Sequence, residues 1–156
     1  MTEHSAISIS DYRALAEVRY QIRRFLHFSE VAARKVGLEP RHHQMMLAIK
    51  AAEGGRPRIA YLAERLQIQH HSAVELLDRL ARRGLIVRKR GDLDRREVHV
   101  NLTAKGERLL GQLTMHTRAE LRSRAPTLVA ALHEITAGKR QPKPERARHK
   151  TAAGGA

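Results

Sequence analysis

The sequence predicts a mainly α-helical fold with one small β-hairpin, of the α+β class. Apolar residues recur at steps of three and four along most of the 156-residue chain, as they do on amphipathic helices. One segment, residues 97–102, instead alternates polar and apolar residues, as a half-buried strand does. Aromatic residues make up only 3% of the chain, so the core must consist of aliphatic side chains and methionine, which suits packed helices.

The first predicted helix covers residues 11–36. Ser10 can cap its N-terminus, and Asp11 is favourable at the positive end of the helix dipole. Gly37 suits the position just past the C-terminus, where the backbone often turns left-handed. The apolar stripe of this helix consists of Leu15, Val18, Ile22, Phe25 and Ser29.

Three shorter helices are predicted next. Pro40 stands where the second helix begins, and Gly54 with Gly55 ends it. Pro57 precedes the third helix, whose apolar positions are Ile59, Leu62, Ala63 and Leu66. After a turn at residues 67–69, a fourth helix closes at Gly84, and its apolar face consists of Val74, Leu77, Leu80 and Ala81.

A β-hairpin and two further helices complete the predicted order. Residues 85–89 form the first strand, and the second strand buries one face only, made of Val98, Val100 and Leu102. The turn between the strands contains Gly91, Asp92 and Asp94. Thr103 can cap the next helix, which breaks at Ala125 and Pro126, and the last helix stops at Gly138. Residues 139–156 lack apolar periodicity and contain six Lys or Arg residues but one acidic residue, which predicts a disordered tail.

A helix-turn-helix with a basic hairpin directly behind it is a winged helix. This arrangement places one helix in the major groove of DNA and the hairpin near an adjacent minor groove. The charge agrees, because 30 Lys and Arg residues against 16 acids give +14 and imply a polyanionic partner, nucleic acid or a membrane surface. No segment approaches the ~18 apolar residues of a membrane-spanning helix, so the sequence favours double-stranded DNA and no membrane partner.

Several other classes of function lack support. Without cysteine there is no disulfide framework, no thiolate metal site and no thiol redox switch. The N-terminal letters MTEHSAISISDY lack the basic start and apolar run of a signal peptide, so we expect a cytoplasmic protein. No P-loop, G-x-S-x-G motif or cysteine nucleophile is present, so we expect neither an enzyme nor a cofactor.

The apolar stripes also predict a homodimer. The first helix and the last two are long, and their stripes are wider than the small central domain can cover. A second copy is the simplest partner, and a two-fold dimer places two recognition helices in successive major grooves, about one turn apart on a pseudo-palindrome. The predicted parts are an N-terminal dimerisation helix, a DNA-binding domain, C-terminal dimerisation helices and a basic tail, at residues 10–37, 38–104, 105–138 and 139–156.

Sequence motifs then indicate a family. The segments GLEPRHHQMMLAI, IAYLAERL and LLDRLARRGLIVR stand at residues 37–49, 59–66 and 76–88. The most specific pattern is D-x-R…L-T-x-x-G, formed by Asp94, Arg96, Leu102, Thr103 and Gly106. In this order the motifs resemble the MarR family of winged-helix regulators over residues 10–138.

The resemblance implies a bacterial or archaeal transcription factor of the nucleoid, usually a dimeric repressor. Many members release DNA when a small, often phenolic, ligand binds between the dimer and DNA-binding parts. This chain departs from the family in two places. Its recognition helix opens with Gln69, His70, His71 and Ser72, where many members have a good N-cap and small hydroxyl residues. It also lacks the cysteine of the oxidant-sensing branch, which excludes that mechanism.

The candidate DNA contacts fall into three groups. On the recognition helix, imidazole, hydroxyl and carboxylate groups can meet base edges, and the candidates are Gln69, His70, His71, Ser72, Glu75 and Arg79. The alternative is that His70 and His71 meet only phosphate or solvent. The wing candidates are Arg88, Arg90, Asp94, Arg95 and Arg96. The resemblance implies that Arg96 enters the minor groove and is held by Asp94, whereas the alternative is a solvated charged turn. Phosphate contacts are expected from Arg58, Arg82 and Arg83.

An effector pocket and a metal site were also considered. A cavity between dimer helices and winged helix would be lined by Tyr12, Tyr20, His43, Met45 and Met46, and would suit a phenolic or other aromatic effector. A metal site built from Glu30, His42 and His116 is imaginable, but no H-x-x-x-H or H-E-x-x-H pattern is present, so we expect no metal.

The sequence therefore predicts a homodimeric, sequence-specific DNA-binding transcriptional regulator, more often a repressor. One alternative is an architectural protein that binds DNA with little sequence preference through its basic surface and tail. A second alternative is a protein-interaction module, against which the intact wing arginines argue.

Overall fold

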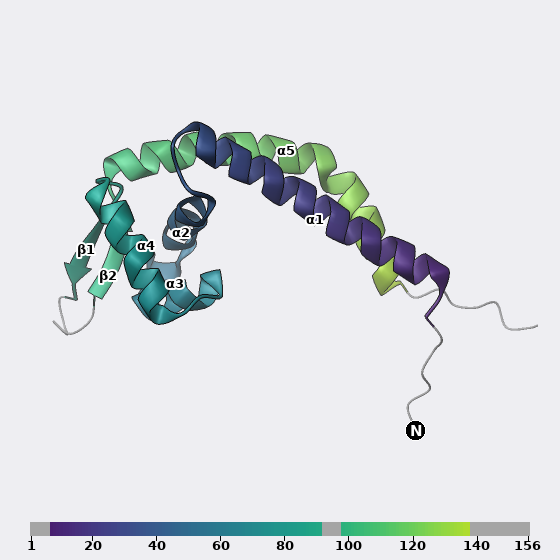
Figure 1. Ribbon diagram of the computed structural model, residues 1–156, viewed down its shortest axis with the longest axis horizontal. Helices are drawn as coiled ribbons and strands as arrows, with labels where there is room; N and C mark the ends of the chain where they lie inside the picture. The colour runs from purple at the N-terminus through teal and green to yellow at the C-terminus, as the bar shows by residue number, and fades with distance from the viewer. Residues whose placement is uncertain (1–6, 92–97, 138–156) are drawn as a thin grey trace, which may run out of the picture.

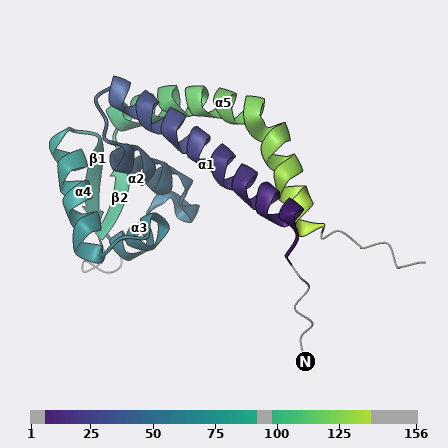
Figure 2. The same cartoon turned by 45° about the vertical axis from the view of Figure 1, so that its right-hand side comes forward.

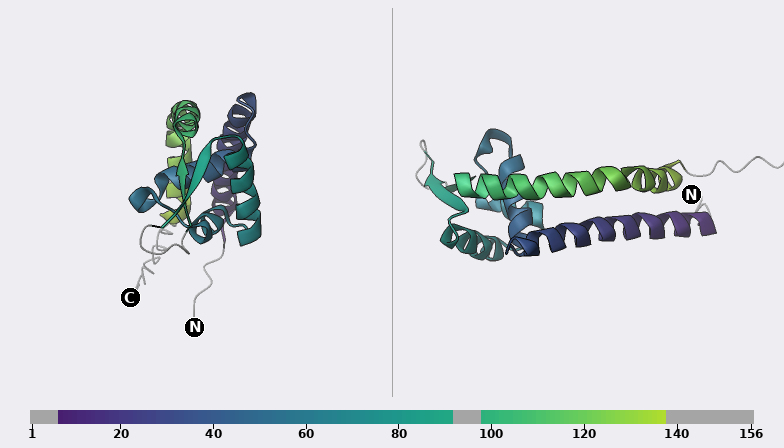
Figure 3. Two further views of the ribbon diagram at one scale, coloured as in Figure 1. Left: turned by 90° about the vertical axis from the view of Figure 1, so that its left-hand side faces the viewer. Right: turned by 90° about the horizontal axis from the view of Figure 1, so that it is seen from above.

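Two long helices extend side by side from a smaller lobe, as Figure 1 shows in a computed structural model that describes residues 7–91 and 98–137. The long helices are α1 (Ile9–Lys35) and α5 (Ala104–Thr136), and they pack against each other along their lengths (Figure 3). The lobe contains α2 (Pro40–Ala51), a short 3-10 turn (Glu53–Gly55), α3 (Ile59–Leu66), α4 (His70–Arg82), β1 (Ile86–Arg90) and β2 (Val98–Leu102). The predicted α+β class is therefore confirmed, and so is the order of elements as far as the helix that begins after the hairpin.

The start of α1 differs from the prediction by two residues. Ser8, not Ser10, is the N-cap, because Asp11 stands three residues after Ser8 and completes a reciprocal capping box. The Ser8 hydroxyl accepts from the Asp11 amide at 3.2 Å, and the Asp11 carboxylate accepts from the Ser8 amide at 2.7 Å. The predicted starts of α2 at Pro40 and of α5 after the Thr103 cap are confirmed.

Helices α1, α3 and α4 end in the same way. A residue one or two positions after each helix end has a left-handed backbone: Gly37 (φ 73°), Gln67 (φ 53°) and Gly84 (φ 68°). The next amide then returns to a carbonyl five residues earlier, as from Leu38 to Ala33 at 2.9 Å. This is the Schellman motif, which satisfies carbonyls that the helix end leaves unpaired. Because Leu85 belongs to this motif, β1 begins at Ile86, one residue later than predicted.

The predicted break at Ala125 and Pro126 is wrong. Helix α5 continues through Pro126 to Thr136 as one helix, and Figure 2 shows it bending towards its C-terminal end. A proline inside a helix removes one backbone hydrogen bond and bends the axis, but packing on both sides of the bend can keep the helix intact. Ala131, past the proline, is buried, as is Ala14 on α1.

The hairpin is held against the turn before α3. Strands β1 and β2 are antiparallel, with Ile86 opposite Leu102 and Arg90 opposite Val98. The Val100 amide donates to Pro57 O at 3.1 Å, so the β2 backbone is also tied to the segment before α3. The prediction that β2 buries one face only is too simple, because its alternate residues are half-buried as well.

The core lies in the lobe, between α2, α3, α4, the hairpin and the first turns of α5. Its largest fully buried side chains are Leu38, Met45, Met46, Leu62, Leu77, Leu80, Leu85, Val100 and Leu113. Within the described residues, none of the helices combines the length and apolarity needed to cross a membrane.

Candidate nucleic-acid interface

Helix α4 presents one face to the core and the other to solvent. Ala73, Leu76, Leu77 and Leu80 are buried, whereas His71, Glu75 and Arg79 are exposed at successive steps of four. His70 is also exposed, and Ser72 is half-buried. Val74, predicted to face the core, is only half-buried. The exposed residues form a polar row that can reach base edges and phosphates of DNA.

The N-terminal end of α4 is open. Gln69 occupies the N-cap position, but its side chain makes no capping hydrogen bond. The first amides of the helix therefore lack the side-chain acceptor that Ser, Thr, Asp or Asn supplies at this position. Such an end is suited to anions, because unpaired amides and the positive end of the helix dipole point the same way.

Arg88 is not free to contact DNA as the sequence suggested. Its guanidinium pairs with Asp78 on α4 at 2.8 Å and donates to Val74 O at 3.2 Å. These contacts tie β1 to α4, so Arg88 positions the hairpin against the recognition helix. Asp78 was not among the predicted residues, although a single acid among the basic residues that end α4 is a signal for such a pair.

Arg83 also has an internal partner instead of a free side chain. Its Nη1 donates to Gly37 O, in the turn between α1 and α2, at 2.7 Å. Arg82 beside it is exposed, and so are Arg79 and Arg90. Arg58 is exposed and is the N-cap of α3, and its backbone bridges to His99 on β2. Arg58 and Arg82 remain predicted phosphate contacts, and Arg79 and Arg90 remain predicted DNA contacts of the recognition helix and the wing.

The predicted wing tip lies outside the described residues. Asp94, Arg95 and Arg96 fall between Gly91 and Val98, and the predictions for Asp92, Gly138 and residues 139–156 also fall outside. Figure 1 shows that α4, β1 and β2 share one end of the molecule, away from the N-terminal end of α1. Strand β1 contacts α4, so the described part of the hairpin lies beside the recognition helix.

The predicted effector residues are not brought into one cavity. Tyr20 lines a cavity between α1 and α5, whereas His43 lines another between α1 and α2. Met45 and Met46 are fully buried in the core, and Tyr12 is exposed near the start of α1. The five residues expected to line one pocket therefore lie at separate places.

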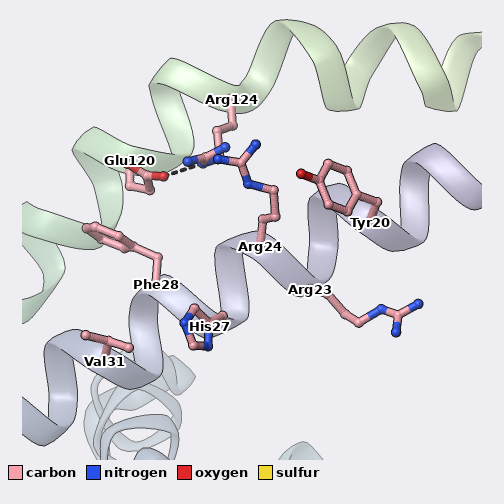
Figure 4. A pocket seen from close by; sticks show the side chains of 8 residues that line it. All are labelled: Tyr20, Arg23, Arg24, His27, Phe28, Val31, Glu120 and Arg124. Atoms are coloured by element: carbon pink, nitrogen blue, oxygen red, sulfur yellow. Dashed lines mark hydrogen bonds and ion pairs between the residues drawn. The ribbon is translucent and has the colours of Figure 1, made fainter.

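The cavity at Tyr20 combines aromatic and cationic side chains (Figure 4). Its volume is about 680 Å³, and its lining is Tyr20, Arg23, Arg24, His27, Phe28, Val31, Glu120 and Arg124. The Arg24 guanidinium lies 5.5 Å from the centre of the Tyr20 ring, and Arg124 pairs with Glu120 within α5. Arg23, Arg24 and Arg124 were not predicted to line a cavity, because the spacing of residues along one helix does not show which side chains of α1 and α5 face each other.

Two adjacent histidines on α2 are buried. His42 and His43 are 5% and 3% exposed, and both have a lowered pKa. Burial is the main cause for each, and for His42 the nearby Arg83 and Arg79 lower the pKa further. Within residues 7–91 and 98–137, no three His, Asp or Glu side chains gather as a metal site would require, so the combination of Glu30, His42 and His116 does not form one.

The long helices leave apolar side chains uncovered. Leu15, Ile22 and Leu26 lie on one side of α1 and are 52%, 44% and 50% exposed. The predicted stripe of α1 is therefore divided, since Val18 of the same stripe is buried. On α5, the exposed large apolar residues are Met115, Leu121, Val129 and Leu132.

Comparison with known proteins agrees with this architecture. Residues 36–97 match the family model of the MarR family. The structure is similar to AbsC, a MarR family transcriptional regulator from Streptomyces coelicolor, with a TM-score of 0.67 and 20% identity over 83% of this chain and 90% of that chain. For RV1404 from Mycobacterium tuberculosis the values are 0.65 and 23%, over 90% and 100% of the two chains.

A third structure contains DNA. A mutant of MarR from E. coli complexed with operator DNA has a TM-score of 0.62 and 18% identity, over 77% of this chain and 88% of that chain. No curated protein matches the sequence. At these identities the likeness establishes the fold, which is the winged helix that the sequence predicted.

Proposed function

Residues 36–97 belong to the MarR family, and from this premise we propose that the protein is a sequence-specific DNA-binding transcriptional regulator that acts as a homodimer and represses its targets. The observation that carries the proposal is the exposed polar face of α4, which begins with an open helix end and lies beside a basic hairpin. A net charge of +14 supplies the general attraction to DNA, and the α4 side chains supply discrimination between bases.

The polar side chains of α4 and of the elements beside it each have a chemical role in this proposal. His70 and His71 donate to purine acceptors, Ser72 reaches a base or phosphate, and Glu75 accepts from a cytosine amino group. Arg79, Arg82, Arg90 and Arg58 neutralise phosphates, which positions the protein without reading sequence. Arg96 is assigned to the minor groove by its family motif, and Arg95 lies beside it in the sequence.

The dimer is supported by the uncovered apolar side chains of the long helices. Leu15, Ile22 and Leu26 on α1 leave a row without a partner inside one copy of the chain. A second copy covers such a row in a closed two-fold assembly. Sedimentation equilibrium tests this point: we expect a dimer for the wild type and a monomer for Ile22→Glu, because a carboxylate in the interface loses its hydration without a partner.

An effector is supported by the cavity between α1 and α5. An aromatic ring fits against Tyr20 and Phe28, and a carboxylate or phenolate on that ring fits the cations Arg23 and Arg24. We propose a small aromatic anion as the ligand and release of DNA as its effect. Benzoate should raise the melting temperature of the wild type more than benzyl alcohol does, and Arg24→Gln should remove that difference.

The DNA-binding proposal is tested by titrating two labelled duplexes with the purified protein. One duplex carries the DNA upstream of its own gene, and the other has the same length and composition in random order. We expect the upstream DNA to bind at least ~10³-fold more tightly, the lower end of specific recognition. Arg96→Ala should weaken that binding by ~1–3 kcal/mol and leave the dimer folded. Equal affinities for both duplexes would support the architectural alternative instead.

A further inference from the structure

The C-terminal end of α4 is joined to both long helices. On one side, Arg83 Nη1 donates to Gly37 O at 2.7 Å, in the turn that ends α1. On the other side, Lys105 Nζ in the first turn of α5 donates to Arg83 O at 3.0 Å. A single residue at the end of the recognition helix therefore bonds to the end of α1 and the start of α5.

The joint to α5 is close and involves the backbone of Gly84 and Leu85. Thr103 Oγ1 donates to Gly84 O at 2.7 Å, and the Thr103 amide donates to Leu85 O at 3.0 Å. A Cβ at Gly106 would overlap the carbonyl of Leu85, so the first turn of α5 lies directly on the chain that leaves α4. This explains why a glycine stands at the end of the L-T-x-x-G motif.

The joint to α1 depends on a side chain. Helix α1 packs mainly on α5, and the Arg83 guanidinium reaches across to the Schellman turn that ends α1. A cation is favourable there, because Gly37 O lies at the negative end of the α1 dipole. A hydrogen bond from a charged donor is also stronger than one between neutral groups.

We propose that Arg83 is a positioning residue that fixes the direction of α4 relative to α1 and α5, and so sets the half-site spacing that the dimer accepts. This inference rests on the proposed function, because spacing matters only when two copies bind DNA together. The two half-sites of such a dimer lie about one turn apart, 10–10.5 base pairs. One added base pair moves a half-site by about 3.4 Å. A dimer whose α4 helices are fixed therefore binds the longer site poorly, whereas a dimer whose α4 helices can move still binds it.

The sequence supplies a matched control for this residue. Arg82 and Arg83 are adjacent, carry the same charge and are both exposed, and Arg83 donates a hydrogen bond to Gly37 O. Arg82→Met and Arg83→Met therefore remove the same charge from the same helix end. Only Arg83→Met removes the bond to α1.

The first experiment measures the direction of α4 without DNA. Because the chain has no cysteine, Arg13→Cys on α1 and Glu75→Cys on α4 place two spin labels on exposed positions. Labelled protein is diluted with unlabelled protein, and the distance distribution is measured by double electron–electron resonance. We expect a broader distribution for Arg83→Met and no change for Arg82→Met. Equal distributions in the wild type and both variants would overturn the proposal.

The second experiment measures spacing. Duplexes carry the two half-sites at the preferred separation and at separations one and two base pairs longer or shorter. The discrimination is the ratio of the affinity at the preferred separation to the affinity at an altered one. We expect this ratio to fall roughly tenfold in Arg83→Met, which is the size of effect that loss of one charge-assisted hydrogen bond can have. Arg82→Met should weaken binding equally at all separations. Unchanged discrimination in Arg83→Met would contradict the inference.

Failure of the two proposals can be told apart. If the wild type shows no preference for any DNA, the proposed function fails, while the spin-label distances still decide whether Arg83 fixes α4. If Arg83→Met does not fold, Lys105→Met removes the contact from α5 to the same residue and enters both experiments in its place. An unchanged distance distribution in Lys105→Met would then count against the joint.

Discussion

The two ends of α4 differ in how they are held. At the N-terminal end, Gln69 makes no capping bond and His70 and His71 are exposed. At the C-terminal end, Gly84 closes a Schellman motif and Arg83 is bonded on both sides. One helix can therefore be held in position at its C-terminal end while its N-terminal end stays accessible to a partner.

The largest expected effect lies at the held end, in Gly106→Ala. The added Cβ overlaps the Leu85 carbonyl, so either α5 or the end of α4 must shift, and we expect a loss of about 3 kcal/mol of stability. Gly111→Ala is the control on the same helix, because a Cβ there meets nothing within 4 Å. Urea unfolding should show Gly111→Ala as stable as the wild type or better, by up to ~1 kcal/mol. Equal losses for both variants would show that the joint is not tight.

Two arginines that were both predicted to contact DNA should behave differently. Arg88→Ala breaks the pair with Asp78 and should cost up to about 1 kcal/mol of stability, the upper range for an exposed pair. Arg79→Ala should leave stability within ~0.5 kcal/mol and lower the salt slope of DNA binding by about 1, as the loss of one phosphate contact does. Thermal unfolding and salt titration of both variants check this pair. A reversal of the two effects would place Arg88, and not Arg79, at the DNA.

Closing the open end should stabilise the protein. Gln69→Ser supplies a capping acceptor to the first turn of α4 and should add about 1 kcal/mol, measured by urea unfolding. The same change should weaken specific DNA binding, because the new cap occupies amides that the proposal leaves for phosphate. If binding is unchanged, these amides do not face the DNA.

The smallest expected effect is a pH dependence from α2. His42 and His43 have a pKa below the ordinary value of 6.5, so they favour the folded state above pH 6.5, and this contribution is lost as pH falls through their folded pKa. Melting temperatures should therefore fall below pH 6.5. His42→Gln should reduce this slope, whereas His71→Gln, at an exposed position, should keep it. If the melting temperature depends on pH equally in both variants, His42 does not cause the pH dependence.

The features that sequence predicts well are local ones. Pro40, Thr103 and Gly84 act through their own backbone or the next turn, so they mark helix boundaries correctly. Ser8 was missed because two serines lie close together, and only the position of Asp11 selects between them. The spacing of apolar residues predicts the helices. It does not predict that α5 continues through Pro126, where packing keeps a helix intact at a residue that usually ends one.

The roles of the arginines could not be read in the same way. Arg83 finds its partner 46 residues away, and its neighbour Arg82 has the same local sequence context. Lys50 on α2 similarly pairs with Glu107 on α5 at 2.7 Å, across 57 residues. Tertiary contacts decide which cation is bonded within the protein and which is available to DNA. They also decide that Tyr20, His43 and Met46 lie at separate places and do not line one pocket.

The measurement that tests the account most directly is footprinting of the wild-type protein on the DNA upstream of its own gene, with random-sequence DNA as competitor. The account predicts a protected pseudo-palindrome of about two helical turns, with its half-sites about one turn apart on one side of the duplex. Diffuse protection that the competitor abolishes would contradict it, because the exposed face of α4 would then read no sequence.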